Sequence, residues 1–114
     1  MPRLKAPKRL QKRAEFLRLA RVGRKKAVPG LVLQAARAEA GDELRVGYTA
    51  TKKIGNAVAR NRAKRRLREA ARLTLAVGGL RGVELVLIAR HETGRVKFSS
   101  LCANLRRAVD EALA

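Results

Sequence analysis

Apolar residues recur along this chain with two different periods, and the period separates predicted strands from predicted helices. Alternating apolar and polar positions predict a half-buried strand, whereas a continuous apolar run is typical of a strand buried on both faces. Gly47 interrupts the clearest alternation, which indicates close approach of another backbone or of a ligand at that point. The strand candidates are residues 31–37 and 44–50, joined by a hairpin loop at 38–43, and the apolar run 82–90.

Three other segments carry the 3.6-residue period of an amphipathic helix. Gly23 ends the first of them, and Gly78 and Gly79 end the second, because glycine stops a helix readily. The third has Ser99 or Ser100 as its expected N-cap. The helix candidates are residues 12–21, residues 57–77 and the C-terminal segment that follows this cap.

These elements follow the order helix, strand, strand, an optional third strand, basic helix, strand, helix. A small sheet must bury its apolar face against another layer, so this order favours an α+β fold in which helices pack on a small mixed sheet. Residues 1–11 are basic and contain Pro2 and Pro7, which discourage a helix. We therefore expect a basic flexible arm over residues 1–11 and one compact two-layer domain over residues 12–114.

The charge balance narrows the class of partner. The 114 residues include 28 Lys and Arg against nine Asp and Glu, which gives a formal net charge of +19. Such an excess raises self-repulsion in the folded state and is tolerated where the usual partner is a polyanion. Nucleic acid is the first candidate for that partner, and an anionic membrane surface is the second.

Cysteine use and hydropathy indicate the cytoplasm. Cys102 is the only cysteine, so an intramolecular disulfide is excluded, which suits a reducing compartment. No apolar run reaches the length of a transmembrane helix, and the N-terminal segment lacks the apolar region of a secretory signal. We therefore expect a cytoplasmic protein that is not embedded in a membrane.

The positive charge is densest in residues 51–69, whose sequence is TKKIGNAVARNRAKRRLRE. On a helical wheel its cations surround a narrow apolar stripe, so one face is left to dock on the sheet and the rest faces an anion. Like charges three and four positions apart weaken an isolated helix, and phosphates would neutralise them. The cations of this helix are Arg60, Arg62, Lys64, Arg65, Arg66, Arg68 and Arg72.

Three uncharged residues interrupt this run. Gly55 and Asn56 precede the helix and can present backbone N–H groups to a phosphate, although a plain N-cap at Asn56 is the simpler interpretation. Lys52 and Lys53 add charge beside that turn. Asn61 lies between two arginines, where it can donate to and accept from a base edge, a 2′-OH or a phosphate; the alternative is a solvated side chain.

Few residues offer other chemistry. Phe16 and Tyr48 can stack on bases or serve as core anchors, and His91 is a loop histidine beside Glu92. The nine acids are scattered, which does not favour a two-metal carboxylate cluster. Cys/His metal-ligand spacing and a Gly-rich phosphate loop are also missing from the sequence. These observations favour a protein that scaffolds RNA or helps an RNA to do chemistry.

Residues 43–70, ELRVGYTATKKIGNAVARNRAKRRLREA, resemble the signature of the protein subunit of bacterial ribonuclease P. The similarity extends more thinly from residue 9 to residue 110. It implies a compact α+β fold, like the second domain of ribosomal protein S5, with a left-handed βαβ crossover that departs from the usual right-handed rule.

The resemblance also implies a division of labour. The RNA subunit carries the active site and its Mg²⁺ ions and removes the 5′ leader of precursor tRNA, so the protein is an accessory subunit of an endoribonuclease without a catalytic residue or metal site of its own. No obligate protein partner is expected. The residues implied to bind the catalytic RNA subunit are Lys52, Lys53, Asn56, Arg60, Asn61, Arg62, Lys64, Arg65 and Arg68. Those expected to bind the precursor tRNA leader, in a cleft between the first helix and the sheet, are Phe16, Tyr48 and Arg90.

Two positions depart from the family pattern. Ala20 and Gln34 stand where members often have aromatic residues, so leader binding should depend more on cations such as Lys53 and Arg90. A ribosomal-type structural RNA-binding protein fits the size and charge equally well, and only the motif argues against it. The missing carboxylate cluster disfavours a protein-only nuclease, and a DNA-compacting protein would not need Asn61 between two arginines.

Overall fold

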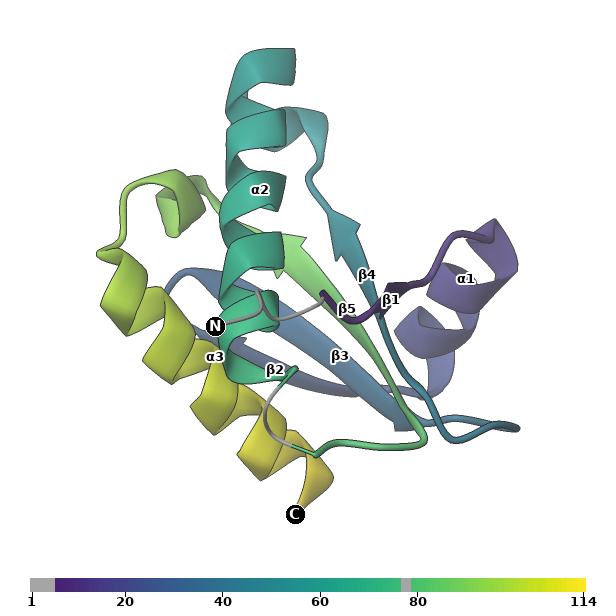
Figure 1. The fold of residues 1–114 in the computed structure, drawn as a ribbon. Helices are drawn as coiled ribbons and strands as arrows, with labels where there is room; N and C mark the ends of the chain where they lie inside the picture. The colour runs from purple at the N-terminus through teal and green to yellow at the C-terminus, as the bar shows by residue number, and fades with distance from the viewer. Residues whose placement is uncertain (1–5, 77–78) are drawn as a thin grey trace.

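A five-stranded mixed sheet forms the centre of the protein (Figure 1). The computed structural model describes residues 6–76 and 79–114. Across the sheet the strands follow the order β1-β4-β5-β3-β2. The strands are β1 (Lys8–Arg9), β2 (Arg24–Val28), β3 (Leu31–Arg37), β4 (Leu44–Thr49) and β5 (Val83–Ala89). The helices are α1 (Arg13–Val22), α2 (Ala57–Thr74) and α3 (Phe98–Leu113), with short 3₁₀ turns η1 (Lys52–Ile54) and η2 (His91–Gly94).

The connection from β4 through α2 to β5 sets the topology. β4 and β5 are parallel neighbours, with Val46 opposite Leu85, whereas β3 is antiparallel to both β5 and β2. In Figure 1, α2 lies in front of these strands and β5 lies to the left of β4, so the crossover is left-handed. This is the unusual hand that the resemblance implies.

The two faces of the sheet have separate cores because side chains alternate along each strand. Leu85 and Leu87 of β5 point into the larger core, which α2 and α3 cover. Val86 and Ile88 point to the other face, where α1 forms a smaller core. The fully buried side chains of the larger core include Leu31, Leu33, Val46, Leu67, Val83, Leu85, Leu87, Leu101 and Leu105. The smaller core consists of Leu10, Leu19 and Val86, with Phe16, Ala36 and Ile88 partly buried against it.

Gly47 is explained by α1. A Cβ at this position would lie 2.5 Å from Cε1 of Phe16, so the ring packs directly on the glycine backbone. The close approach that the sequence indicates is therefore made by a side chain of the same protein.

Several element boundaries differ from the sequence predictions. The optional strand exists, but it is β2, which precedes the other two; its sequence RKKAV is mostly charged, as an exposed edge strand allows. Within the segment expected as an arm, Lys8–Arg9 instead pairs with β4, and Leu10 is buried. The third helix begins at Phe98, with Lys97 as its N-cap, not after a serine cap.

Two other predictions fall partly on residues that the structure does not describe. Residues 1–5 of the expected arm lie outside them, as do Val77 and Gly78 at the expected end of the second helix. The described part of α2 ends at Thr74, with Leu75 as its C-cap. No helix within the described ranges is both long enough and apolar enough to span a membrane.

Candidate nucleic-acid interface

Helix α2 begins with a defined cap, as the sequence predicts. The side-chain Oδ1 of Asn56 accepts a hydrogen bond from the backbone N–H of Ala59 at 2.9 Å. Gly55, just before it, has a φ of +140°, a conformation that favours glycine because it has no Cβ. Lys52 and Lys53 are exposed in η1, immediately before this cap. The start of α2 is thus a fixed corner at which cations flank the positive end of the helix dipole.

One side of α2 carries cations that have no acidic partner in the described part of the chain. The opposite side docks on the sheet through Ala63, Leu67 and Ala70, all buried, which confirms the predicted apolar stripe. Arg62 and Arg65 are exposed, and so is Asn61 on the same turns. Among residues 6–76 and 79–114, no Asp or Glu forms an ion pair with any member of a set that we call the α2 basic surface. This set is Arg60, Arg62, Lys64, Arg65 and Arg68.

Two further cations of α2 serve the fold. Arg66 donates hydrogen bonds from Nη1 to the carbonyl oxygen of Gly94 at 3.5 Å and from Nη2 to that of Val96, and its guanidinium lies 5.8 Å from the ring centroid of Phe98. Arg72 forms an ion pair with Glu69 one turn earlier. Because these groups are engaged internally, Arg66 and Arg72 are not part of the α2 basic surface.

Tyr48 lies on the same face of the sheet as α2. It is partly buried against the larger core, and the guanidinium of Arg9 lies 6.0 Å from its ring centroid. Burial raises the pKa of Tyr48 to about 12, although the charges of Arg9 and Arg68 act in the opposite direction. The structure therefore does not bring Tyr48 together with Phe16, since the two residues occupy opposite faces.

The face of the sheet that α1 only partly covers is the second surface of interest. Phe16 borders it, packed on Gly47, and Ile88 and Val32 are partly exposed on it. The alternation along β5 places the exposed Arg90 next after Ile88 on this face, and Arg90 pairs with Glu92 at 3.5 Å. Two residues stand where family members often have aromatic residues. Of these, Gln34 is buried and Ala20 is exposed.

A network of ion pairs joins α1 to the sheet. Glu84 of β5 is only 8% exposed, and its carboxylate contacts Nη1 of Arg18 at 2.8 Å and Nη1 of Arg45 at 3.3 Å. Arg45 also pairs with Glu15 at 2.5 Å, and Arg18 with Glu39 at 3.1 Å. Arg18 and Glu15 belong to α1, so the network fixes the helix that carries Phe16.

The sequence reasoning missed this network, although one signal pointed to it. Glu84 is an acid inside an otherwise apolar run, and a buried acid requires a cationic partner. The partners are 39 and 66 positions away in sequence, so the signal predicts a pair without identifying its members.

The carboxylate of Glu15 makes stability depend on pH. The backbone N–H of Lys12 donates to it at 2.9 Å and, with Arg45, holds the pKa of Glu15 below its ordinary value of 4.5. A lowered folded-state pKa stabilises the protein above the unfolded value, and this contribution is lost as the pH falls through the folded value. Urea unfolding should therefore show that Glu15→Gln lowers the free energy of unfolding at neutral pH, and that this deficit shrinks as the pH falls below 4.5. Glu111→Gln is the exposed control, and a deficit for Glu15→Gln that did not change with pH would contradict the assignment.

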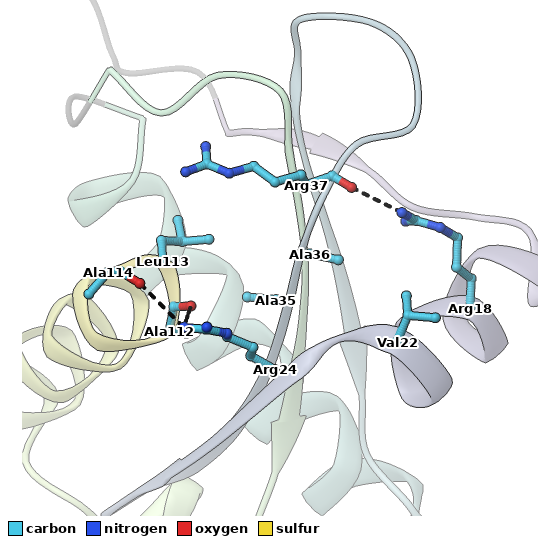
Figure 2. A pocket seen from close by; sticks show the side chains of 9 residues that line it. All are labelled: Arg18, Val22, Arg24, Ala35, Ala36, Arg37, Ala112, Leu113 and Ala114. Atoms are coloured by element: carbon cyan, nitrogen blue, oxygen red, sulfur yellow. Dashed lines mark hydrogen bonds between the residues drawn. The ribbon is translucent and has the colours of Figure 1, made fainter.

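A hollow of about 470 Å³ lies at the opposite end of the sheet from the start of α2, between α1, β3 and the end of α3 (Figure 2). Two of its three arginines are already engaged: Nη1 of Arg24 donates to the carbonyl oxygen of Ala114 at 3.3 Å, and Nη2 of Arg18 donates to that of Arg37 at 3.0 Å. Figure 2 shows both contacts among the residues that line the hollow. We interpret it as a packing gap that these arginines bridge.

The comparisons with known proteins agree on one family. A family model described as "Ribonuclease P" matches residues 4–113. The ribonuclease P protein component of Gluconacetobacter diazotrophicus is 53% identical over 104 residues, which cover 91% of this chain and 90% of that protein.

Solved structures give the same result for the fold. The ribonuclease P protein of Staphylococcus aureus superposes with a TM-score of 0.76 at 27% identity, covering 91% of this chain and 94% of the other. The ribonuclease P protein of Thermotoga maritima superposes with a TM-score of 0.73 at 28% identity, covering 92% and 94%.

Proposed function

Because this chain belongs to the ribonuclease P protein family, which acts in tRNA processing, we propose that it binds the catalytic RNA subunit and the 5′ leader of precursor tRNA. In this proposal it acts in the cytoplasm and assists the endonucleolytic cleavage that makes the mature 5′ end of tRNA. The RNA subunit carries the active site, and the protein holds the RNA and its substrate together.

The observation that carries this proposal is the α2 basic surface, with its five cations that no acid of the described residues neutralises. Several like charges on neighbouring turns weaken a helix unless a polyanion faces them. RNA phosphates meet this requirement, and each phosphate contact also releases condensed counterions. Lys52, Lys53 and Asn56 extend the surface to the start of the helix, and Asn61 offers a donor and an acceptor between two arginines.

The partly covered face beside α1 supports leader binding. Single-stranded RNA is bound by aromatic stacking combined with cations that follow the backbone. Phe16 supplies a ring at the border of this face, and Arg90 supplies charge at its other end. Tyr48 lies on the opposite face of the sheet. Any contact that it makes with RNA is therefore proposed on the face that α2 covers.

The proposal assigns Mg²⁺ to the RNA subunit. Across the part of the chain that the structure describes, no group of three or more His, Cys, Asp or Glu side chains gathers as a metal site. Glu15 and Glu84 are held by arginines. The side chains of the described residues therefore do not form a site for a catalytic metal.

The direct test is cleavage of precursor tRNA by a ribonuclease P RNA at low Mg²⁺ concentration, with and without this protein. Low Mg²⁺ leaves more phosphate repulsion for the protein cations to offset, so we expect a gain in rate and in substrate affinity. If the protein bound the RNA but changed neither quantity, a structural RNA-binding role would replace the proposed function.

Leader binding leads to a prediction for Phe16. Phe16→Ala should weaken binding of a precursor with a leader about tenfold, in line with the loss of one base stack, and leave a leaderless tRNA unaffected. Phe16→Leu separates stacking from packing, because it keeps apolar bulk over Gly47. Leu17→Ala, an exposed position of the same helix, is the matched control. An equal loss for both RNAs would show that Phe16 supports only the fold.

A further inference from the structure

Hydrogen bonds fix the turn after β5 to two other parts of the fold. Thr93 of η2 is fully buried, and its Oγ1 donates to the carbonyl oxygen of Gly30 at 2.5 Å and accepts from the backbone N–H of Arg90 at 2.7 Å. Glu92 accepts a hydrogen bond from the N–H of Gly30 at 3.4 Å. One side of η2 is therefore fixed to the turn between β2 and β3.

The other side of η2 is fixed to α2. The guanidinium of Arg66 binds the carbonyl oxygens of Gly94 and Val96, at the end of the turn and just beyond it. A loop held from two sides keeps its backbone in a constant position, so the points from which its remaining side chains project are also constant. The side chains that these contacts leave free are those of His91 and Arg95, both exposed.

These two side chains share a hollow of about 230 Å³ with the basic helix. The apolar part of its lining is buried or partly buried and consists of Ile54, Ala59 and Ala63, beside Gly94. The polar part is exposed and consists of Arg62, His91 and Arg95. Among the described residues, neither Arg62 nor Arg95 has an ion-pair partner, so both charges are available to a ligand.

We propose that this hollow binds one nucleotide of the RNA subunit, with its phosphate between Arg62 and Arg95. The apolar part of the lining takes the sugar or the base, and His91 offers a ring for stacking and a nitrogen for hydrogen bonding. The volume lies below the roughly 300 Å³ at which pockets for drug-sized ligands begin, so the hollow takes only the base or the sugar of the nucleotide, and the phosphate stays outside it beside the arginines. The inference rests on the proposed function and extends the RNA contacts beyond α2 to η2.

Charge and geometry both favour RNA here. Two guanidinium groups at the mouth of one hollow match the oxygens of a phosphate, and arginine binds phosphate with two parallel hydrogen bonds. The contacts that hold η2 come from Thr93, Glu92 and Arg66. Replacing His91 or Arg95 therefore leaves the position of the turn unchanged.

The test measures affinity of the full-length protein for the ribonuclease P RNA over a range of salt concentrations. Arg95→Ala should weaken binding about tenfold and lower the slope of log affinity against log salt by about 0.7 to 0.9, the range for one phosphate contact with a single strand or a double helix. His91→Ala should weaken binding about threefold, with a smaller change in slope. The matched control is Arg107→Ala, which removes the same charge from an exposed position of α3 outside the hollow.

A double-mutant cycle tests whether the two arginines share one phosphate. If they do, Arg62→Ala with Arg95→Ala loses less affinity than the product of the two single losses, because either change already removes most of the contact. The inference would be overturned if the double variant lost as much affinity as the product of the two single losses. It would also be overturned if Arg95→Ala lost no more affinity than Arg107→Ala. The double variant Arg62→Ala with Arg65→Ala tests the proposed function separately. If that function holds, this variant weakens RNA binding even when the inference about the hollow is wrong. If this variant binds RNA as well as the unchanged protein, the proposed function itself is wrong.

Discussion

Replacing Arg62 and Arg65 together by alanine is expected to weaken binding of the ribonuclease P RNA about 100-fold at moderate salt and to flatten its salt dependence. Each arginine that neutralises a phosphate contributes about 0.7 to 0.9 to the slope of log affinity against log salt, so the slope should fall by about 1.4 to 1.8. Both side chains are exposed on α2 and neither pairs with an acid of the described residues. The loss should therefore come from missing contacts with RNA.

The same variant should not be less stable. Alanine is the best helix former, and removing two of several like charges relieves repulsion along the helix. We expect the free energy of unfolding in urea to stay constant or to rise by a few tenths of a kcal/mol. Arg81→Ala with Arg107→Ala is the control, since it removes equal charge away from α2. If this control lost as much affinity, net charge rather than the α2 basic surface would account for binding.

Replacing Glu84 by glutamine is expected to lower the free energy of unfolding by about 2 kcal/mol, because two arginines then lose a partly buried counterion. The value lies below the usual loss for a broken buried pair because Arg18 retains Glu39 and Arg45 retains Glu15. Urea unfolding at neutral pH measures it. The variant keeps the shape of the side chain, so the loss reports on charge and not on a cavity.

A matched substitution separates this network from ordinary surface pairs. Glu43 forms an exposed ion pair with Lys8, and such pairs contribute at most about 1 kcal/mol, so Glu43→Gln should have little effect. Equal losses for the two variants would contradict the role given to Glu84. Because the network holds α1, Glu84→Gln should also weaken binding of precursors with a leader more than binding of leaderless tRNA.

Much of the fold follows from local patterns in the sequence. The alternation over residues 44–50 and the apolar run over 82–90 predict β4 and β5 closely, because their side chains face defined cores. β2 could not be predicted in the same way. Lys26 of this edge strand pairs with Glu111 of α3, and Arg24 binds carbonyl groups at the end of α3, so its charges are explained only by tertiary contacts.

The candidate site also has a part that the local sequence predicts and a part that depends on long-range contacts. A helical wheel finds the α2 basic surface because it depends only on neighbouring positions. It does not reveal the partners of Arg66, since the carbonyl groups that this side chain binds lie 28 and 30 positions away. It also cannot assign a face to Tyr48 relative to Phe16, which depends on α1 crossing to the opposite side of the sheet. Long-range placement is the part that the sequence leaves open.

The contact of Phe16 with Gly47 has a mechanical consequence. Gly47 faces α1, and the next residue of β4, Tyr48, faces α2, so one peptide unit joins the two surfaces proposed to hold the leader and the RNA subunit. β4 is hydrogen-bonded on both sides, to β1 and to β5. Neither surface can slide along the strand without breaking those bonds. The protein is therefore built as a rigid spacer, and the offset between the two surfaces proposed to bind RNA is fixed by the thickness of one sheet.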